Sequence, residues 1–287
     1  MSEETNPYWE SFPNLFSNAI TAKVGNRIPW HKYSSSPRSS QTFCISAFGS
    51  LIDCEKNAEV LKRFLAPHFP TWAQSDSCWK IHLEYSDRTL LNEVVGTPTQ
   101  VDALLENSGT VVTIESKFVA DAAEGLGSCS KFPKECKGHY GPGSDMASSS
   151  CWCLLERWNG RRTPRLYWTL GRSYFRDTIF AQQQVGDACP FRGPHFQLMR
   201  NFLLASAFAM RHRKTRFGTV VICPKSCRAP LESQVEAFKK EVLRPEFENL
   251  VHMAFYDDYI EALRNVGDER LARLAEFLQQ RMEAETP

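Results

Sequence analysis

Two carboxylates and one ammonium group lie close together in a short stretch of this sequence: Asp102, Glu115 and Lys117. Two carboxylates held near each other repel unless a cation bridges them. Mg²⁺ prefers oxygen ligands, usually one or two carboxylates together with waters and phosphate oxygens. A lysine beside such an ion can hold or help to deprotonate an attacking water, and it can stabilise charge on a phosphate. These residue types therefore indicate the chemistry of phosphodiester hydrolysis.

A β-hairpin would bring these side chains to one face of a sheet. Two apolar segments, 101–105 and 111–118, flank a Glu-Asn-Ser-Gly sequence rich in turn-forming residues, which is typical of a hairpin. A turn centred between the Asn and the Ser predicts Asp102 opposite Thr113 and diagonal to Glu115. A shift of one residue in register would separate the two carboxylates. The opposite face of the second strand is mostly apolar and is expected to pack on the core: Val112, Ile114, Ser116 and Phe118.

This arrangement resembles the PD-(D/E)XK nuclease superfamily, which has the restriction-endonuclease-like fold. In that family an Asp ends one strand of a hairpin and a Glu-x-Lys sequence lies on the next strand. Asp102, Glu115 and Lys117 match these positions. The residue before Asp102 is Val101 and not the proline of the family name, and many members also lack that proline. The resemblance covers residues 80–118 well.

The resemblance extends more weakly through a helix predicted at 195–211 and a strand predicted at 218–223. A cysteine-bearing insertion followed by Cys189-Pro-Phe and by Gln197-Leu-Met-Arg-Asn also looks like a cysteine-containing subgroup of restriction-type endonucleases.

The resemblance implies a divalent-metal-dependent endonuclease that hydrolyses DNA phosphodiester bonds, in restriction or defence. Asp102 and Glu115 would hold Mg²⁺ or Mn²⁺, and Lys117 would position the attacking water. RNA is an alternative substrate, because no feature of the sequence distinguishes the sugar of RNA from that of DNA. A non-catalytic nucleic-acid-binding or assembly module of the same fold is a second alternative. The sequence is compatible with a homodimer and with a partner protein.

Further acidic and polar residues are candidates for the same site. In several groups of the superfamily, a Gln or a charged residue on the helix after the Glu-x-Lys strand reaches the active site. Gln197 matches that position, and Arg200 is expected to contact a phosphate. Glu93 is expected as an extra metal ligand, whereas Glu55 and Glu59 on the first predicted helix are an alternative source of a helix-borne acid.

Cysteines gather in the segment that follows the hairpin. Thiolates in a loop-rich stretch of a cytoplasmic protein indicate Zn²⁺ or an iron–sulfur cluster. We expect four of them to bind a structural Zn²⁺ ion: Cys129, Cys136, Cys153 and Cys189. Superfamily members with iron–sulfur clusters also place a cysteine before the hairpin, so the resemblance favours zinc. The spacing differs from that of zinc ribbons, and a set of unrelated thiols is the alternative.

Arginines and aromatic residues alternate in the same segment. Guanidinium groups next to stacking rings suit a phosphate backbone or unstacked bases. We therefore expect Arg161, Arg162 and Arg165 to bind nucleic acid. Ordinary packing of arginines on aromatic rings is the alternative.

The whole chain limits the class of protein. A net charge of +1 gives no global attraction to nucleic acid, so any binding face must come from local clustering. The acidic, polar start of the chain does not match a secretory signal, and no apolar run approaches the roughly 20 residues that span a bilayer. These features predict a cytoplasmic protein without a membrane segment, in which the ten cysteines are thiols or metal ligands.

We predict an α/β fold with a restriction-endonuclease-like mixed central sheet flanked by helices. The expected strands are 79–85, 101–105, 111–118, 218–223 and 251–255. The expected helices are 43–66, 195–211, 232–243 and 268–282. Residues 1–40 are expected to form a partly flexible N-terminal extension, and residues 41–287 a nuclease-like domain that carries a Cys-rich insertion at 119–194.

Overall fold

The computed structural model of the protein describes most of the chain from Arg38 onwards. The described residues are 28, 36, 38–52, 54–72, 78–94, 96–118, 125–129, 157–158, 161–162, 164–181 and 189–285. For 157–158, 161–162, 181 and 285 only the backbone is described.

A five-stranded mixed sheet forms the centre of the molecule, in the order β1-β2-β3-β6-β7. The first three strands pair antiparallel, and β3 pairs parallel with β6, which pairs parallel with β7. The strands are β1 (Lys80–Ser86), β2 (Gln100–Glu106), β3 (Thr110–Ser116), β6 (Arg216–Cys223) and β7 (Val251–Phe255). A second, two-stranded sheet joins β4 (Arg157–Trp158) and β5 (Arg161–Arg162).

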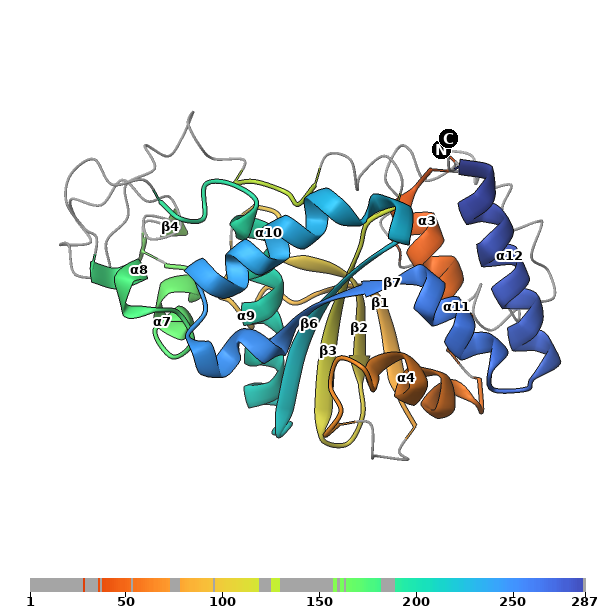
Figure 1. Ribbon diagram of the computed structural model, residues 1–287. Helices are drawn as coiled ribbons and strands as arrows, with labels where there is room; N and C mark the ends of the chain where they lie inside the picture. The colour runs from red at the N-terminus through yellow and green to blue at the C-terminus, as the bar shows by residue number, and fades with distance from the viewer. Residues whose placement is uncertain are drawn as a thin grey trace, which may run out of the picture.

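Helices cover both faces of the central sheet, and a separate apolar core lies under each layer (Figure 1). One layer contains α7 (Tyr167–Gly171), α8 (Asp177–Ala181), α9 (His195–Arg211) and α10 (Arg228–Glu241). The other contains α3 (Ser40–Cys44), α4 (Asn57–Leu65), α11 (Tyr256–Arg264) and α12 (Glu269–Glu285). Short 3₁₀ helices lie at Lys225–Cys227 and Pro245–Leu250. This three-layer α/β architecture confirms the predicted fold class.

The hairpin prediction is confirmed, but its predicted register was wrong by two residues. The pairs Leu104 with Thr113 and Ala103 with Ile114 place Asp102 opposite Glu115. The turn is centred one residue later than expected, because the Asn107 side chain accepts hydrogen bonds from the backbone N–H groups of residues 109 and 110, at 3.0 and 2.8 Å. A shift by an even number keeps every side chain on its predicted face. The two carboxylates are therefore closer neighbours than the sequence indicated.

The helix predicted at 43–66 was wrong as a single element. The chain forms α3, continues through a π-helical turn at Ile45–Gly49, and begins α4 at Asn57. The hydroxyl groups of Ser46 and Ser50 donate to the carbonyl groups four residues earlier, at 2.8 and 2.7 Å, and such bonds bend helices. The Asn57 side chain hydrogen-bonds to both backbone groups of Trp79. This contact starts the second helix beside β1.

The remaining predicted strands and helices end within a few residues of their predicted bounds, whereas β4, β5, α7, α8 and α11 were not predicted. Helix α11 packs on the sheet beside α4 and α12. Its Tyr256 and Tyr259 are fully buried in the core under α3 and α12. No helix in the described part of the chain has the length and apolar character needed to cross a membrane.

Replacing Asn107 with alanine should lower the free energy of unfolding by about 1–3 kcal/mol, because two backbone N–H groups in the turn lose their acceptor. Asn107→Asp keeps an acceptor oxygen and should retain most of the stability. Urea unfolding of the three proteins measures the difference. An unchanged midpoint for Asn107→Ala would show that this side chain does not fix the turn.

Candidate active site

The Glu115 carboxylate lies at the carboxyl end of β3 and is bound by two amides from α9. Gln197 Nε2 donates to Oε1 at 2.5 Å, and Asn201 Nδ2 donates to Oε2 at 2.7 Å. Lys117 Nζ lies 3.2 Å from Oε1. Gln197 and Asn201 are four residues apart, so they project from the same face of the helix. Glu115 is only 4% exposed, and these donors compensate its buried charge.

Asp102 lies across the hairpin from Glu115 and accepts a hydrogen bond from the backbone N–H of Ser116, at 2.7 Å from Oδ2. Burial raises the pKa of Asp102 well above its ordinary value, and the negative charges of Glu115 and Glu84 raise it further. Asp102 is partly exposed and Glu115 is buried, and two neighbouring carboxylates with this electrostatic cost are stabilised by a divalent cation between them. The oxygen donors of Asp102 and Glu115 therefore suit Mg²⁺ or Mn²⁺.

The end of β3 is held in place from three directions. The backbone N–H of Lys117 donates to the Ile222 carbonyl at 2.8 Å, and that of Phe118 donates to Ser40 Oγ at 2.7 Å. A hydrogen bond of 2.6 Å joins Ser116 Oγ and Tyr256 Oη. Strand β6 and helices α3 and α11 thus fix the backbone that carries the Glu-x-Lys sequence.

Residues 125–129 lie against α9 and α10 and fix the orientation of Gln197. The backbone N–H of Gly127 donates to Gln197 Oε1 at 2.7 Å, so the amide presents its nitrogen to Glu115. The neighbouring N–H of Leu126 donates to Gln234 Oε1 at 2.8 Å. Gly125 has φ +78°, and a Cβ atom there would lie 2.5 Å from the Gln234 amide. The approach of this segment therefore depends on glycine.

Glu93 is fully buried in a polar network of its own. Its carboxylate accepts hydrogen bonds from the Thr99 N–H and hydroxyl groups, at 2.7 and 2.8 Å, and from the Tyr167 hydroxyl group. Arg165 Nη1 and Arg200 Nη2 lie 3.4 and 3.6 Å from Oε1. The sequence suggested Glu93 as a metal ligand and Arg165 and Arg200 as nucleic-acid contacts. In the structure these three side chains instead interact with one another. We therefore leave Glu93 out of the proposed metal site.

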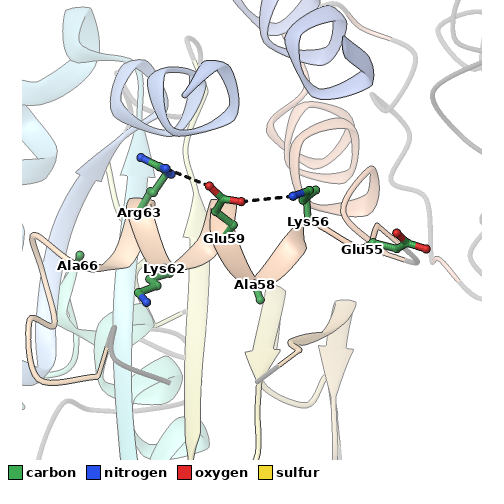
Figure 2. A pocket seen from close by; sticks show the side chains of 7 residues that line it. All are labelled: Glu55, Lys56, Ala58, Glu59, Lys62, Arg63 and Ala66. Atoms are coloured by element: carbon green, nitrogen blue, oxygen red, sulfur yellow. Dashed lines mark hydrogen bonds and ion pairs between the residues drawn. The ribbon is translucent and has the colours of Figure 1, made fainter. Parts of the chain in front are cut away.

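Glu59 lies on α4 and Glu55 in the turn just before it, and both line an open pocket (Figure 2). Glu59 forms ion pairs with Arg63 and Lys56, at 2.9 and 3.8 Å. The segment after α4 contacts the start of β6, since Arg216 Nη1 donates to the carbonyl of residue 71. That is the opposite end of the sheet from Glu115. These two acids therefore do not serve as a helix-borne acid of the site.

Two of the four predicted zinc ligands lie in the described residues. The backbone N–H of Cys129 donates to the Arg192 carbonyl at 3.3 Å, and the N–H of Arg192 donates to the Cys189 carbonyl at 3.1 Å. The fold thus brings Cys129 next to the turn that starts at Cys189. Cys136 and Cys153 lie outside the described residues, as do the side chains of Arg161 and Arg162. Within the described residues, no three His, Cys, Asp or Glu side chains are already arranged as ligands of one ion.

The sequence places Asn201 on the helical face of Gln197 and Arg200 without giving it a role, and it does not single out Glu84. Asn201 had a usable signal, because it lies one helical turn after Gln197. Glu84 lies on β1, where its backbone has φ +49°. Burial raises the pKa of Glu84 to about 7, although hydrogen bonds from Gln41 and Gln100 lower it. Nothing local in the sequence marks this residue.

Comparison with known proteins supports the resemblance to restriction endonucleases. A family model described as "Restriction Endonuclease associating with ARP" matches residues 4–281, nearly the whole chain. The searches of curated proteins and of solved structures found no match. The family match confirms the restriction-endonuclease-like family that was predicted from Asp102, Glu115 and Lys117.

The free energy of unfolding of the metal-free protein should decrease as the pH rises from about 4.5 to about 7. Asp102 and Glu84 have raised pKa values in the folded protein, so the folded state keeps protons that the unfolded chain releases, and stability falls through this window. Added Mg²⁺ should increase the melting temperature more at pH 8 than at pH 5. Thermal unfolding with and without Mg²⁺ measures both effects, and an equal Mg²⁺ effect at both pH values would contradict the assignment.

Proposed function

The chain belongs to the family of restriction endonucleases that associate with ARP, and on that basis we propose that it is a divalent-metal-dependent endonuclease that hydrolyses DNA phosphodiester bonds. The observation that carries the proposal is the position of Asp102 opposite Glu115, with Lys117 Nζ 3.2 Å from Glu115. This donor set matches the preference of Mg²⁺ and Mn²⁺ for carboxylate oxygens. A closed apolar core at this point of the sheet would need none of these charges.

Each residue of the site has a distinct task in this proposal. Asp102 and Glu115 hold the divalent ion, which when bound stabilises charge on the scissile phosphate and lowers the pKa of a water molecule. Lys117 holds the attacking water and adds positive charge beside the phosphate. Gln197 and Asn201 orient the two oxygens of Glu115. Their rigid attachment to α9 reduces the motion of the carboxylate, and such positioning contributes to the rate.

DNA is the proposed substrate because restriction endonucleases act on DNA, and the family description also supplies a partner, ARP. The net charge of +1 requires a local basic surface for binding. We propose Arg161 and Arg162 as phosphate contacts, since Arg165 and Arg200 are engaged with Glu93. RNA cleavage stays the alternative substrate class.

A non-catalytic nucleic-acid-binding or assembly module is the second candidate function. It predicts a gel shift without cleavage under every divalent metal. The intact set of Asp102, Glu115 and Lys117, with both Glu115 oxygens oriented by amides, favours catalysis, because such an arrangement of buried charges is costly to a fold that does not use it.

We also propose a structural Zn²⁺ ion at Cys129, Cys136, Cys153 and Cys189. Backbone hydrogen bonds join Cys129 to Arg192 and Arg192 to Cys189. The fold thus brings the segments of these two cysteines together, which supports this set. Residues 125–129 contact Gln197, so an ion at Cys129 would stabilise the same segment that orients the Gln197 amide towards Glu115. A site closed by four thiolates has no open position for water and serves structure only.

Glu115→Ala should reduce cleavage of plasmid DNA by about 100-fold or more, because the metal loses a ligand. Excess EDTA should abolish cleavage by the wild-type protein, and Mg²⁺ or Mn²⁺ should restore it. Agarose-gel assays measure both effects, and circular dichroism checks the fold. The exposed Glu276→Gln variant is the matched control and should cleave normally. Full activity in EDTA would rule out the mechanism.

Metal analysis of the purified protein should find one zinc per chain. Cys129→Ser and Cys189→Ser should lower the zinc content and the melting temperature, whereas Cys54→Ser should change neither the zinc content nor the cleavage activity. A brown protein that absorbs blue light would instead indicate an iron–sulfur cluster. A protein without either metal would leave these cysteines as unrelated thiols.

A further inference from the structure

We propose that Glu84 on β1 is a further ligand of the divalent ion at Asp102. The proposal rests on the endonuclease function above and adds a residue that neither the sequence motif nor the family match assigns. It would make the metal site a set of carboxylates from three adjacent strands, with Lys117 at its edge.

The strand pairing places the three carboxylates in one row. On β1 and β2, Leu83 pairs with Ala103 and Tyr85 pairs with Val101, so Glu84 lies opposite Asp102. On the other side of β2, Asp102 lies opposite Glu115. Neighbouring strands are about 4.8 Å apart. The row therefore brings a third negative charge beside the pair, and Glu84 and Glu115 both act on the pKa of Asp102.

On both β1 and β2, the residues just before and just after this row pack on opposite faces of the sheet. Leu83 and Ala103 pack in the core under α3 and α4, whereas Tyr85 and Val101 pack in the core under α9. Residues two apart on a regular strand share a face, so each strand is sharply twisted between them. On β1 the twist occurs at Glu84, in the left-handed conformation that a residue with a side chain adopts at a cost. Strain that persists at a non-glycine residue points to a use for its side chain.

The Glu84 carboxylate has one oxygen available for a cation. Oε2 accepts a hydrogen bond from Gln100 Nε2, and the Gln41 side chain also hydrogen-bonds to the group. Oε1 is buried and accepts no hydrogen bond from any residue in the described ranges. A buried acceptor without a donor is costly. A cation would satisfy this oxygen and would offset the repulsion from Asp102.

The three carboxylates do not yet converge on one point, since no ligand set of three is formed within the described residues. A rotation of the flexible Glu84 side chain from Gln100 towards Asp102 would complete the set. The competing interpretation is a structural one, in which Glu84 only links β1 to Gln41 on α3. That interpretation predicts a loss of stability on substitution and no change in metal affinity.

The test is isothermal titration of the metal-free full-length chain with MnCl₂. Glu84→Gln keeps the shape of the side chain and removes its charge, so the affinity for Mn²⁺ should fall by about 10-fold or more. Glu84→Gly suits the left-handed backbone and should show the same loss if the first variant does not fold. Glu276→Gln should bind Mn²⁺ as the wild type does. Cleavage by Glu84→Gln should be reduced and should recover partly at high Mn²⁺ concentration.

The outcomes separate this role from the proposed function. A folded Glu84 variant that binds Mn²⁺ as tightly as the wild type overturns the role of Glu84, and wild-type cleavage then leaves the endonuclease proposal intact. A wild-type protein that neither binds Mn²⁺ nor cleaves nucleic acid overturns the endonuclease proposal, and the role of Glu84 with it.

Discussion

The buried charge of Glu115 is the constraint on which the arrangement of the site depends. A carboxylate that is 4% exposed must be matched by donors, because an unpaired buried charge costs far more than a fold can supply. The donors come from α9, so β3 and α9 can pack in only one relative position. That position also sets where Lys117 lies relative to Glu115.

Glu93 is a second buried carboxylate that interacts with α9, one helical turn after Gln197. Arg200 lies between Gln197 and Asn201 in sequence, and its side chain reaches Thr99 Oγ1 at 2.9 Å and approaches Glu93. Thr99 directly precedes β2, the strand of Asp102. The helix is therefore attached to both strands of the hairpin, each time through a buried carboxylate. Arg200 contributes to the site by holding β2 in place.

Local pattern was enough to predict the hairpin, the face that carries the charges and the positions of α9, α10 and α12. The register was two residues off because the Asn107 side chain, and not the turn composition alone, sets the turn. The first helix was predicted too long, since apolar spacing does not reveal serine hydroxyl groups bonded to helix carbonyls or the pairing of Asn57 with Trp79. Glu84 could not be found from the sequence. Its place depends on the pairing of β1 with β2 and on a left-handed backbone conformation, which no local pattern encodes.

The parts of the site are far apart in the chain: Gln197 follows Glu115 by 82 residues. A ribosome adds about 5–20 residues per second, so the amides of α9 emerge roughly 4–16 s after the carboxylate that they orient. During that interval the nascent chain holds the acidic hairpin without the helix that completes it. If the chain cleaves DNA as we propose, this order of assembly would keep it inactive on the ribosome, and its synthesis would carry little risk for the DNA of the cell that makes it.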